Sequence, residues 1–305
     1  MSFDFLIYTF PVSGVTTNLL YPPFIMFVIS LFTSTAGVSG AFALLPLQIS
    51  VFGYTSPGVS ATNFVYNIVA IPAGVIKYIK DRLLSKSLLI LLIVGTTPGI
   101  FLGYYIRVIY LLDPAKFKIF VGCVLLYLGA RVFQSGLVEY RKRIFVSLQK
   151  STCSAIQQER MGFLKTTIFL DSGEKVSFSN VTVFIPAFIS GIIGGAYGIG
   201  GGAIMSPFCI AVLGLPVYVV AGATLASTWT SSLISVLIYA FGPLVGHNLQ
   251  TSPDWQLGLL FGLGGMGGIY IGARLQKIIR PFIIKVILGL VVLSVALKYL
   301  VFSLI

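Results

Sequence analysis

Two long apolar runs in this chain are each interrupted near the middle by small and polar residues. The first covers Phe24 to Gly53 and contains the stretch Ser34 to Gly40; the second covers Val181 to Val217 and contains GIIGGAYGIGGG from Gly191 to Gly202. As straight helices the runs would measure about 45 and 55 Å, against about 30 Å for the hydrocarbon core of a bilayer. Because glycine disfavours helix, each run is predicted to form a broken hairpin of two half-helices.

Six further apolar runs have lengths close to that of a membrane-spanning helix. Three follow each broken run, at 58–80, 87–106 and 117–135, then at 218–242, 257–276 and 283–303. The pattern predicts an all-α polytopic membrane protein. We divide the chain into an N-terminal lead-in (1–22), a first membrane repeat (23–135), a linker (136–180) and a second membrane repeat (181–305). Within the linker, alternation from Leu164 to Phe178 predicts a β-hairpin.

Glycines and prolines recur in the same order in the two repeats. Gly37, Gly40, Pro46 and Gly53 reappear 161 residues later, and a second set of glycines is repeated further on, with Gly95, Gly99 and Gly103 matched by Gly264, Gly268 and Gly272. Matching hydrophobic segments interrupted by glycine and proline are typical of transporters built from inverted repeats, whose binding sites lie at the interruptions. The order of the matches therefore predicts two inverted repeats, each with one broken hairpin and three transmembrane helices.

Composition and charge agree with a membrane location. The 305 residues are 57% hydrophobic and 9% charged, with a formal net charge of +12. Most basic residues lie at the ends of apolar runs, as the positive-inside rule requires, which disfavours a nucleic-acid partner. With inverted repeats, most of them fall on one side and only Arg107, Lys116 and Lys118 on the other. We therefore predict a multi-pass protein of the cell membrane, with its termini outside and its central loop in the cytoplasm.

Groups suited to catalysis or metal binding are scarce in the predicted membrane core. All eight acidic residues fall in predicted loops or termini, and the single histidine, His247, lies in a loop. Three cysteines without CxxC spacing give neither a disulfide framework nor a zinc site. The sequence therefore predicts no enzyme, no cofactor and no metal site. Two ways of coupling transport to an ion gradient stay open. Na⁺ could be held by hairpin carbonyls and hydroxyls, or H⁺ could be carried on the substrate.

Small neutral polar residues supply the candidate substrate-binding site. Thr224, Thr228, Ser231 and Ser235 share one helix face, and Asn63 and Asn67 lie one turn apart on the matching helix. Hydroxyls and amides beside half-helix N-termini can bind an oxyanion without a buried opposite charge, although such residues also join helices. The candidate site comprises Ser34, Thr35, Gly37, Ser39, Gly40, Asn63, Asn67, Gly198, Gly200, Gly201, Gly202, Thr224, Ser227, Thr228 and Trp229.

Three short motifs resemble the sulfite exporter TauE/SafE family, also called the toluene sulfonate uptake permeases. They are GIGGGAIMSP from Gly198 to Pro207, its weaker copy GVSGAFALLP from Gly37 to Pro46, and GATLAS from Gly222. The resemblance covers both membrane repeats and implies a secondary transporter for sulfite, an organosulfonate or a related small sulfur-containing anion. Asn63 stands where the second half has Leu225, so the site is expected to be asymmetric.

A channel for small anions or neutral solutes is the alternative, because paired half-helices also build pores. The sequence does not determine which anion is moved, in which direction, or whether the chain forms a homo-oligomer.

Overall fold

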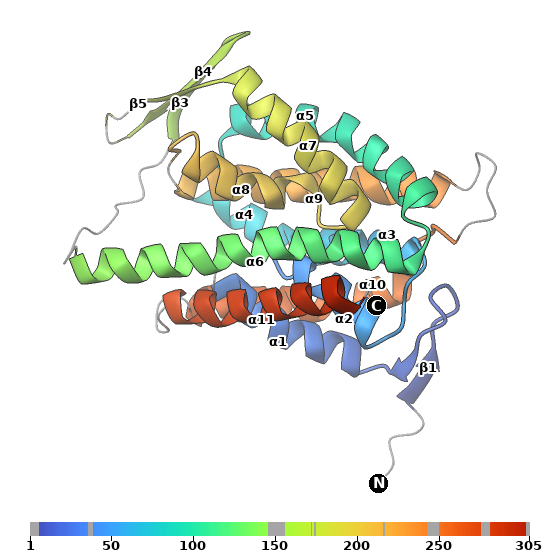
Figure 1. The fold of residues 1–305 in the computed structure, drawn as a ribbon. Helices are drawn as coiled ribbons and strands as arrows, with labels where there is room; N and C mark the ends of the chain where they lie inside the picture. Colours follow the sequence, from blue (N-terminus) through green and yellow to red (C-terminus); the bar gives the residue numbers. More distant parts are fainter. Residues whose placement is uncertain are drawn as a thin grey trace.

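A computed structural model describes residues 6–35, 39–145, 156–171, 173, 175–215, 217–242, 250–275 and 281–302 of the chain. Within these residues the fold is a bundle of α-helices with two small antiparallel sheets (Figure 1). In the lead-in, β1 (Ile7–Thr9) pairs with β2 (Thr16–Asn18). In the linker, β3 (Ile156–Met161), β4 (Lys165–Leu170) and β5 (Lys175–Ser179) form a sheet of order β3-β4-β5. The pair β4–β5 occupies the stretch where alternation predicts a hairpin.

The first apolar run breaks where its small and polar residues predict. Helix α1 (Tyr21–Thr35) ends within the stretch Ser34 to Gly40, and α2 (Ala41–Ser50) begins directly after it. The next predicted span is divided in two, α3 (Gly58–Ala70) and α4 (Pro72–Lys80), because Pro72 opens the second piece. Two long helices complete this part, α5 (Lys86–Tyr105), continued by a π-helical turn (Ile106–Tyr110), and α6 (Pro114–Phe145).

The second apolar run also breaks at the predicted glycines. Helix α7 (Asn180–Tyr197) ends at Gly198, whose φ is +100°, and α8 (Gly201–Ala211) begins after Gly200, whose φ is +82°. Both backbone conformations are left-handed and favour glycine strongly. The chain continues as α9 (Val217–Phe241), α10 (Trp255–Leu275) and α11 (Pro281–Phe302).

Helices α7 and α6 are longer than predicted, since a half-helix is expected at the start of the second broken run and a span ending at 135 is expected for α6. Among the described residues, six helical stretches are long and apolar enough to cross a membrane, and α7 is one of them at 18 residues, or about 27 Å. The predicted span at 257–276 is present as α10. Helix α6 continues to Phe145, past the predicted start of the linker at 136, and Glu139 on this extension forms a 2.8 Å ion pair with Lys285 of α11.

The two hairpins begin at opposite ends of the bundle. At the end that carries the three-stranded sheet, the Ser87 N–H of α5 donates a 2.8 Å hydrogen bond to Glu159, and β5 leads directly into α7. At the other end, the Gly58 N–H of α3 donates to the Gln250 carbonyl at 3.0 Å, and the β1–β2 segment leads into α1 (Figure 1). Helix α7 therefore starts at the sheet end, and α1 starts at the end opposite to it.

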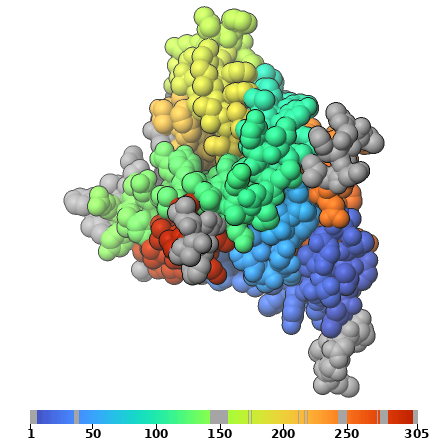
Figure 2. All heavy atoms as spheres, turned by 45° about the vertical axis from the view of Figure 1, so that its right-hand side comes forward, coloured from blue at the N-terminus to red at the C-terminus, as the bar shows by residue number. Residues whose placement is uncertain are grey.

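Helices from the two parts of the chain pack against each other in a reciprocal way. Helix α1 packs on α10, and α7 packs on α5; Figure 2 shows α7, in yellow, against α5, in teal. A methyl group added to Gly268 of α10 would collide with the Phe27 carbonyl oxygen of α1, and one added to Gly99 of α5 would collide with the Phe188 carbonyl oxygen of α7. The repeated glycines are therefore sites of close helix packing.

Candidate functional site

The tip of the second hairpin is a tight glycine turn between two helix ends. Helix α7 ends and α8 begins within four residues, and the backbones of Gly194 and Gly200 are so close that a methyl group on Gly194 would lie 2.8 Å from the Gly200 carbonyl carbon. Gly200, which precedes α8, has no side chain to cap the N–H groups of the first turn, as serine or aspartate would. The tip therefore presents the carbonyl end of one helix beside the N–H end of another.

Side chains of α3 satisfy the carbonyl end. Ser60 Oγ donates to the Ala196 carbonyl at 2.9 Å, Asn63 Nδ2 to the Gly198 carbonyl at 2.9 Å, and Asn67 Nδ2 to the Ile199 carbonyl at 3.0 Å. The three residues follow each other at three- and four-residue spacing, which places them on one face of α3. The hydroxyl of Tyr239 in α9 adds a fourth bond, to the Gly195 carbonyl at 2.9 Å. The carbonyl end of α7 is thus bound by side chains of two other helices.

Asn63 also joins the two hairpins. Its second Nδ2 hydrogen bond goes to the Ala41 carbonyl at the start of α2, at 2.9 Å. Tyr197, the last residue of α7, donates its hydroxyl to the Phe42 carbonyl at 2.8 Å. In the first hairpin, Ser39 Oγ accepts from the Ala41 N–H at 3.3 Å, and Gly40 is packed against the Tyr66 hydroxyl. The break of the first hairpin is therefore adjacent to the end of α7.

The hydroxyl stripe of α9 faces the N–H end of the tip. Thr224, Thr228, Ser231 and Ser235 donate their hydroxyl protons to carbonyl oxygens of α9 itself, at 2.7–3.1 Å. Such bonds to the preceding turn leave the oxygen lone pairs free to accept. A methyl group on Gly202 would lie 2.7 Å from Thr228 Oγ1, and one on Gly200 would lie 3.0 Å from Ser231 Oγ. The glycines of the tip thus allow α8 to approach the stripe closely.

The remaining residues of the predicted site have different surroundings. Trp229 points from α9 toward α3, where its Nε1 donates to the Ile68 carbonyl at 3.2 Å. Ser34 donates to the Leu31 carbonyl at 3.2 Å and packs against Gly272 of α10, so its hydroxyl lies in the α1–α10 contact. Ser227 is buried, and its hydroxyl forms no hydrogen bond within the described residues. Gly37 and His247 lie outside those residues, and Thr35 is described only as the end of α1.

Arg107 is a buried cation, although the charge pattern predicts a base at the membrane surface. Its side chain is fully buried at the end of α5, where the guanidinium donates to the Thr55 carbonyl at 3.2 Å and to the Leu111 carbonyl. The guanidinium carbon lies 3.6 Å from the centre of the Phe117 ring, a cation–π contact. Its place inside the apolar stretch Tyr104 to Leu112 was the signal that it is buried.

Two more polar residues near the hairpins were not selected from the sequence. Gln48 of α2 is fully buried, and neither of its amide atoms forms a hydrogen bond within the part of the chain that the structure describes. Thr96 of α5 lies against Gly201, because a methyl group there would be 2.5 Å from Thr96 Cγ2. Neither residue belongs to a periodic polar stripe, and only the packing brings Thr96 to the tip.

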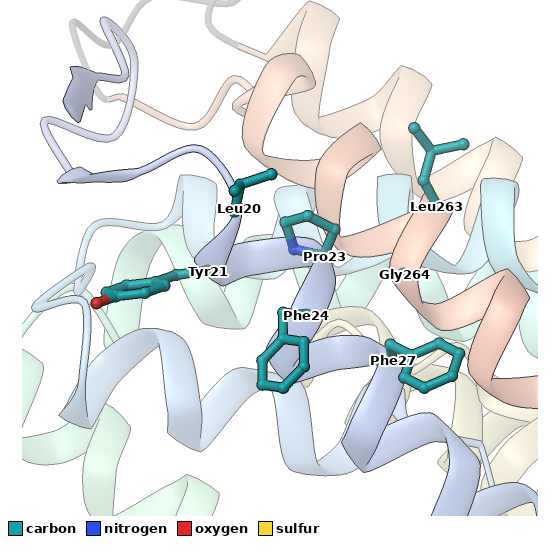
Figure 3. Close-up of a pocket in the computed structure, with 7 residues that line it drawn as sticks. All are labelled: Leu20, Tyr21, Pro23, Phe24, Phe27, Leu263 and Gly264. Carbon is teal, nitrogen blue, oxygen red and sulfur yellow. The ribbon is translucent and has the colours of Figure 1, made fainter. Parts of the chain in front are cut away.

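An apolar groove lies on the outside of the bundle, away from the tip. Residues of α1 and α10 with the chain just before α1 form it (Figure 3): Leu20, Tyr21, Pro23, Phe24, Phe27, Leu263 and Gly264. Phe24 and Leu20 are mostly exposed there. In a membrane protein such a surface is suited to contact with lipid chains.

Comparison with known proteins gives the family. The profile described as Sulfite exporter TauE/SafE matches residues 23–299. The chain is 21% identical over 272 residues to "Probable membrane transporter protein YunE" of Bacillus subtilis (strain 168), covering 86% of this chain and 90% of that protein. It is 26% identical over 264 residues to a "Probable membrane transporter protein" of Xylella fastidiosa (strain 9a5c), covering 85% and 86%. No solved structure matches significantly. The profile matches most of the chain, and the described residues form six apolar helices long enough to span a membrane. This chain therefore belongs to the sulfite exporter TauE/SafE family of membrane transporters.

Proposed function

We propose that this membrane transporter is a secondary carrier for sulfite, an organosulfonate or a related small sulfur-containing anion, working by alternating access around the two hairpin tips. The observation that carries the proposal is the buried N-terminus of α8, which follows a glycine turn and meets the hydroxyl stripe of α9. N–H groups at a helix N-terminus, with the positive end of the helix dipole, bind anions without a full opposite charge. In transporters, half-helix N-termini hold anionic substrate groups in this way.

The arrangement of the helices supports two inverted repeats, 23–135 and 181–305. Hairpins α1–α2 and α7–α8 begin at opposite ends of the bundle, and the packing of α1 on α10 mirrors the packing of α7 on α5. Basic residues from Lys77 to Lys86 and from Arg160 to Lys175 belong to the sheet end. By the positive-inside rule, this end and the linker (136–180) are cytoplasmic and the termini are outside, in the cell membrane.

Alternating access requires the tip to separate from α9. In the structure Gly200 and Gly202 are packed directly on Ser231 and Thr228. An oxyanion reaches the N–H groups of α8 only when this contact opens, while α3 continues to hold the carbonyl end of α7. Thr224 and Thr228 then donate to the anion by turning their hydroxyl protons away from the Val220 and Thr224 carbonyls, and the Ser227 hydroxyl, which has no partner among the described residues, is a further donor. This motion opens the site to one side of the membrane at a time.

Flux through proteoliposomes tests the proposal. The purified chain should exchange labelled sulfite for unlabelled sulfite or sulfoacetate with saturation and counterflow. Thr228→Val should weaken apparent affinity about ten- to hundredfold, since one hydrogen bond to a charged ligand is worth roughly 1.5–3 kcal/mol. Thr230→Val is the matched control, because Thr230 donates to its own helix at 3.0 Å in the same way, to the Ala226 carbonyl, but is not on the stripe.

The outcomes separate the carrier from the alternative. Flux that does not saturate, or single-channel currents, would favour the channel. Equal effects of the two threonine variants would remove the anion from the α8–α9 contact. Gly201→Val does not discriminate, because its side chain would collide with Thr96 whether or not an anion binds.

A further inference from the structure

The carboxamide oxygens of Asn63 and Asn67 are buried without a partner. Both residues are fully buried on α3, and neither Oδ1 atom forms a hydrogen bond within the described residues. A buried acceptor left unsatisfied is costly, so two of them one helical turn apart indicate that something absent from the protein itself occupies the site.

The orientation of the two amides is decided by their neighbours. Asn63 Nδ2 lies 2.9 Å from the Ala41 and Gly198 carbonyl oxygens, which can only accept. Asn67 Nδ2 lies 3.0 Å from the Ile199 carbonyl and 3.2 Å from Ser232 Oγ, whose proton goes to the Thr228 carbonyl. Rotating either amide would bring its oxygen against these acceptors. The oxygens are therefore the groups left for a ligand.

A third buried asparagine shows that this arrangement is not general in the chain. Asn180, at the start of α7, uses all of its amide: Oδ1 accepts from the Thr166 hydroxyl at 2.7 Å, and Nδ2 donates to the Gly162 and Phe163 carbonyls at 2.7 and 3.1 Å. The unpaired oxygens thus belong to the hairpin tip and not to buried asparagines as such.

The chemistry of the surroundings selects a cation. The tip end of α7 carries the negative pole of its helix dipole, and the polar atoms that contact the two amides, through Nδ2, are carbonyl and hydroxyl oxygens. Lone pairs repel an oxyanion and attract a cation or a hydrogen-bond donor. Divalent cations in proteins usually require carboxylates, and no metal-binding group of acidic, histidine or cysteine side chains exists among the described residues. An amide is not basic enough to hold a proton. Neutral oxygens beside a half-helix C-terminus are the ligands that Na⁺ takes in transporters.

We propose that Asn63 Oδ1 and Asn67 Oδ1 bind one Na⁺ ion beside the tip of the α7–α8 hairpin. The two residues are four apart on α3, where side chains on adjacent turns are about 5–6 Å apart at Cβ, near enough to share an ion. Both amides also hold the tip, so Na⁺ binding stabilises the contact between α3 and the hairpin. Its role as the coupling ion rests on the proposed anion transport, whereas the binding of Na⁺ does not.

Thermal unfolding of the full-length chain in detergent tests the site. As NaCl replaces N-methyl-D-glucamine chloride at constant ionic strength, the midpoint of the wild-type protein should rise and saturate, and radioactive Na⁺ should bind with the same dependence. Asn63→Ala and Asn67→Ala should lose the Na⁺-dependent rise and the bound Na⁺. Asn180→Ala should lower the midpoint but keep both responses, since it removes a buried asparagine with no free oxygen.

The opposite results are equally defined. A midpoint that does not distinguish Na⁺ from N-methyl-D-glucamine, with no bound radioactive Na⁺, would overturn the proposal. Retention of Na⁺ binding by folded Asn67→Ala would do the same, even if Asn63→Ala fails to fold.

Sulfite, added as its N-methyl-D-glucamine salt, gives an independent measurement. If sulfite raises the midpoint and Na⁺ does not, the Na⁺ site is wrong and the anion function stands. If Na⁺ raises the midpoint and no sulfur-containing anion does so or is transported, the Na⁺ site stands and the proposed function is wrong.

Discussion

Helices α3 and α9 each follow a broken hairpin, yet their polar side chains bond in different ways. On α3, Ser60, Asn63 and Asn67 donate to carbonyls of α7 and the tip, more than 130 residues away in the chain. On α9, Thr228 and Ser235 donate to carbonyls four residues earlier in the same helix. The polar side chains of α3 lie close enough to the tip to reach its carbonyls, and Ser60 does so with a hydroxyl alone, whereas the hydroxyls of the α9 stripe bond to their own helix.

The difference divides the tip into a fixed side and a side that can open. Breaking the α3 contact leaves backbone carbonyls unsatisfied in the interior, which is unfavourable. Separation of α8 from α9 breaks packing at Gly200 and Gly202 but none of the hydroxyl bonds within α9. We therefore expect α3 substitutions to lower stability, and α9 substitutions to affect ligand binding with little loss of stability.

The largest effect is expected for Asn63→Leu, which gives α3 the residue that α9 has at the corresponding place. The Ala41 and Gly198 carbonyls would both lose a donor, which should lower the free energy of unfolding by roughly 2–4 kcal/mol. Unfolding in detergent without Na⁺ measures it. Unchanged stability would mean that Asn63 does not join the hairpins.

The reciprocal substitution, Leu225→Asn, should also destabilise the protein, by roughly 1–2 kcal/mol, because it places an amide at a half-buried position against α4 where α9 offers no established partner. Leu225 packs against Gly74 of α4, so the new amide would face helix backbone. The same unfolding experiment applies, with Leu225→Met as the apolar control. A neutral or stabilising effect would show that α9 can accept the bonding of α3.

Ser60→Ala should have a moderate effect. One donor to the Ala196 carbonyl is removed, with an expected loss of about 1 kcal/mol. Hydrogen exchange of the α7–α8 segment should increase locally while exchange in α6 and α11 does not. Equal acceleration in all helices would contradict a local role at the tip.

The smallest effect on stability is expected for Thr228→Val, within about 0.5 kcal/mol, because the Thr224 carbonyl keeps its helical backbone bond. Combined with the expected loss of anion affinity, this variant distinguishes a binding role from a structural one. A large loss of stability would place Thr228 among the residues that hold the fold.

Much of the architecture could be predicted from local pattern. The break between α1 and α2 and the break at 198–200 follow from glycine and from run lengths greater than a bilayer, and α9 and α11 match their predicted spans within two residues. The stripe of α9 and the spacing of Asn63 and Asn67 also follow from helical periodicity. The length of α6 was not predicted, because its last turns are polar and are held by Glu139 and Lys285 from two separate helices.

What the sequence by itself determined is where the helices break and which polar residues share a face, because these depend on backbone preference and on a period of 3.6 residues. The tertiary structure decided what those residues bind. Ser34 faces α10, Arg107 is buried over Phe117, and the Asn63 and Asn67 amides give their hydrogens to carbonyls of α2 and the α7–α8 tip. A hydrogen bond needs its two atoms within about 3 Å, and only the packing of distant segments sets that distance.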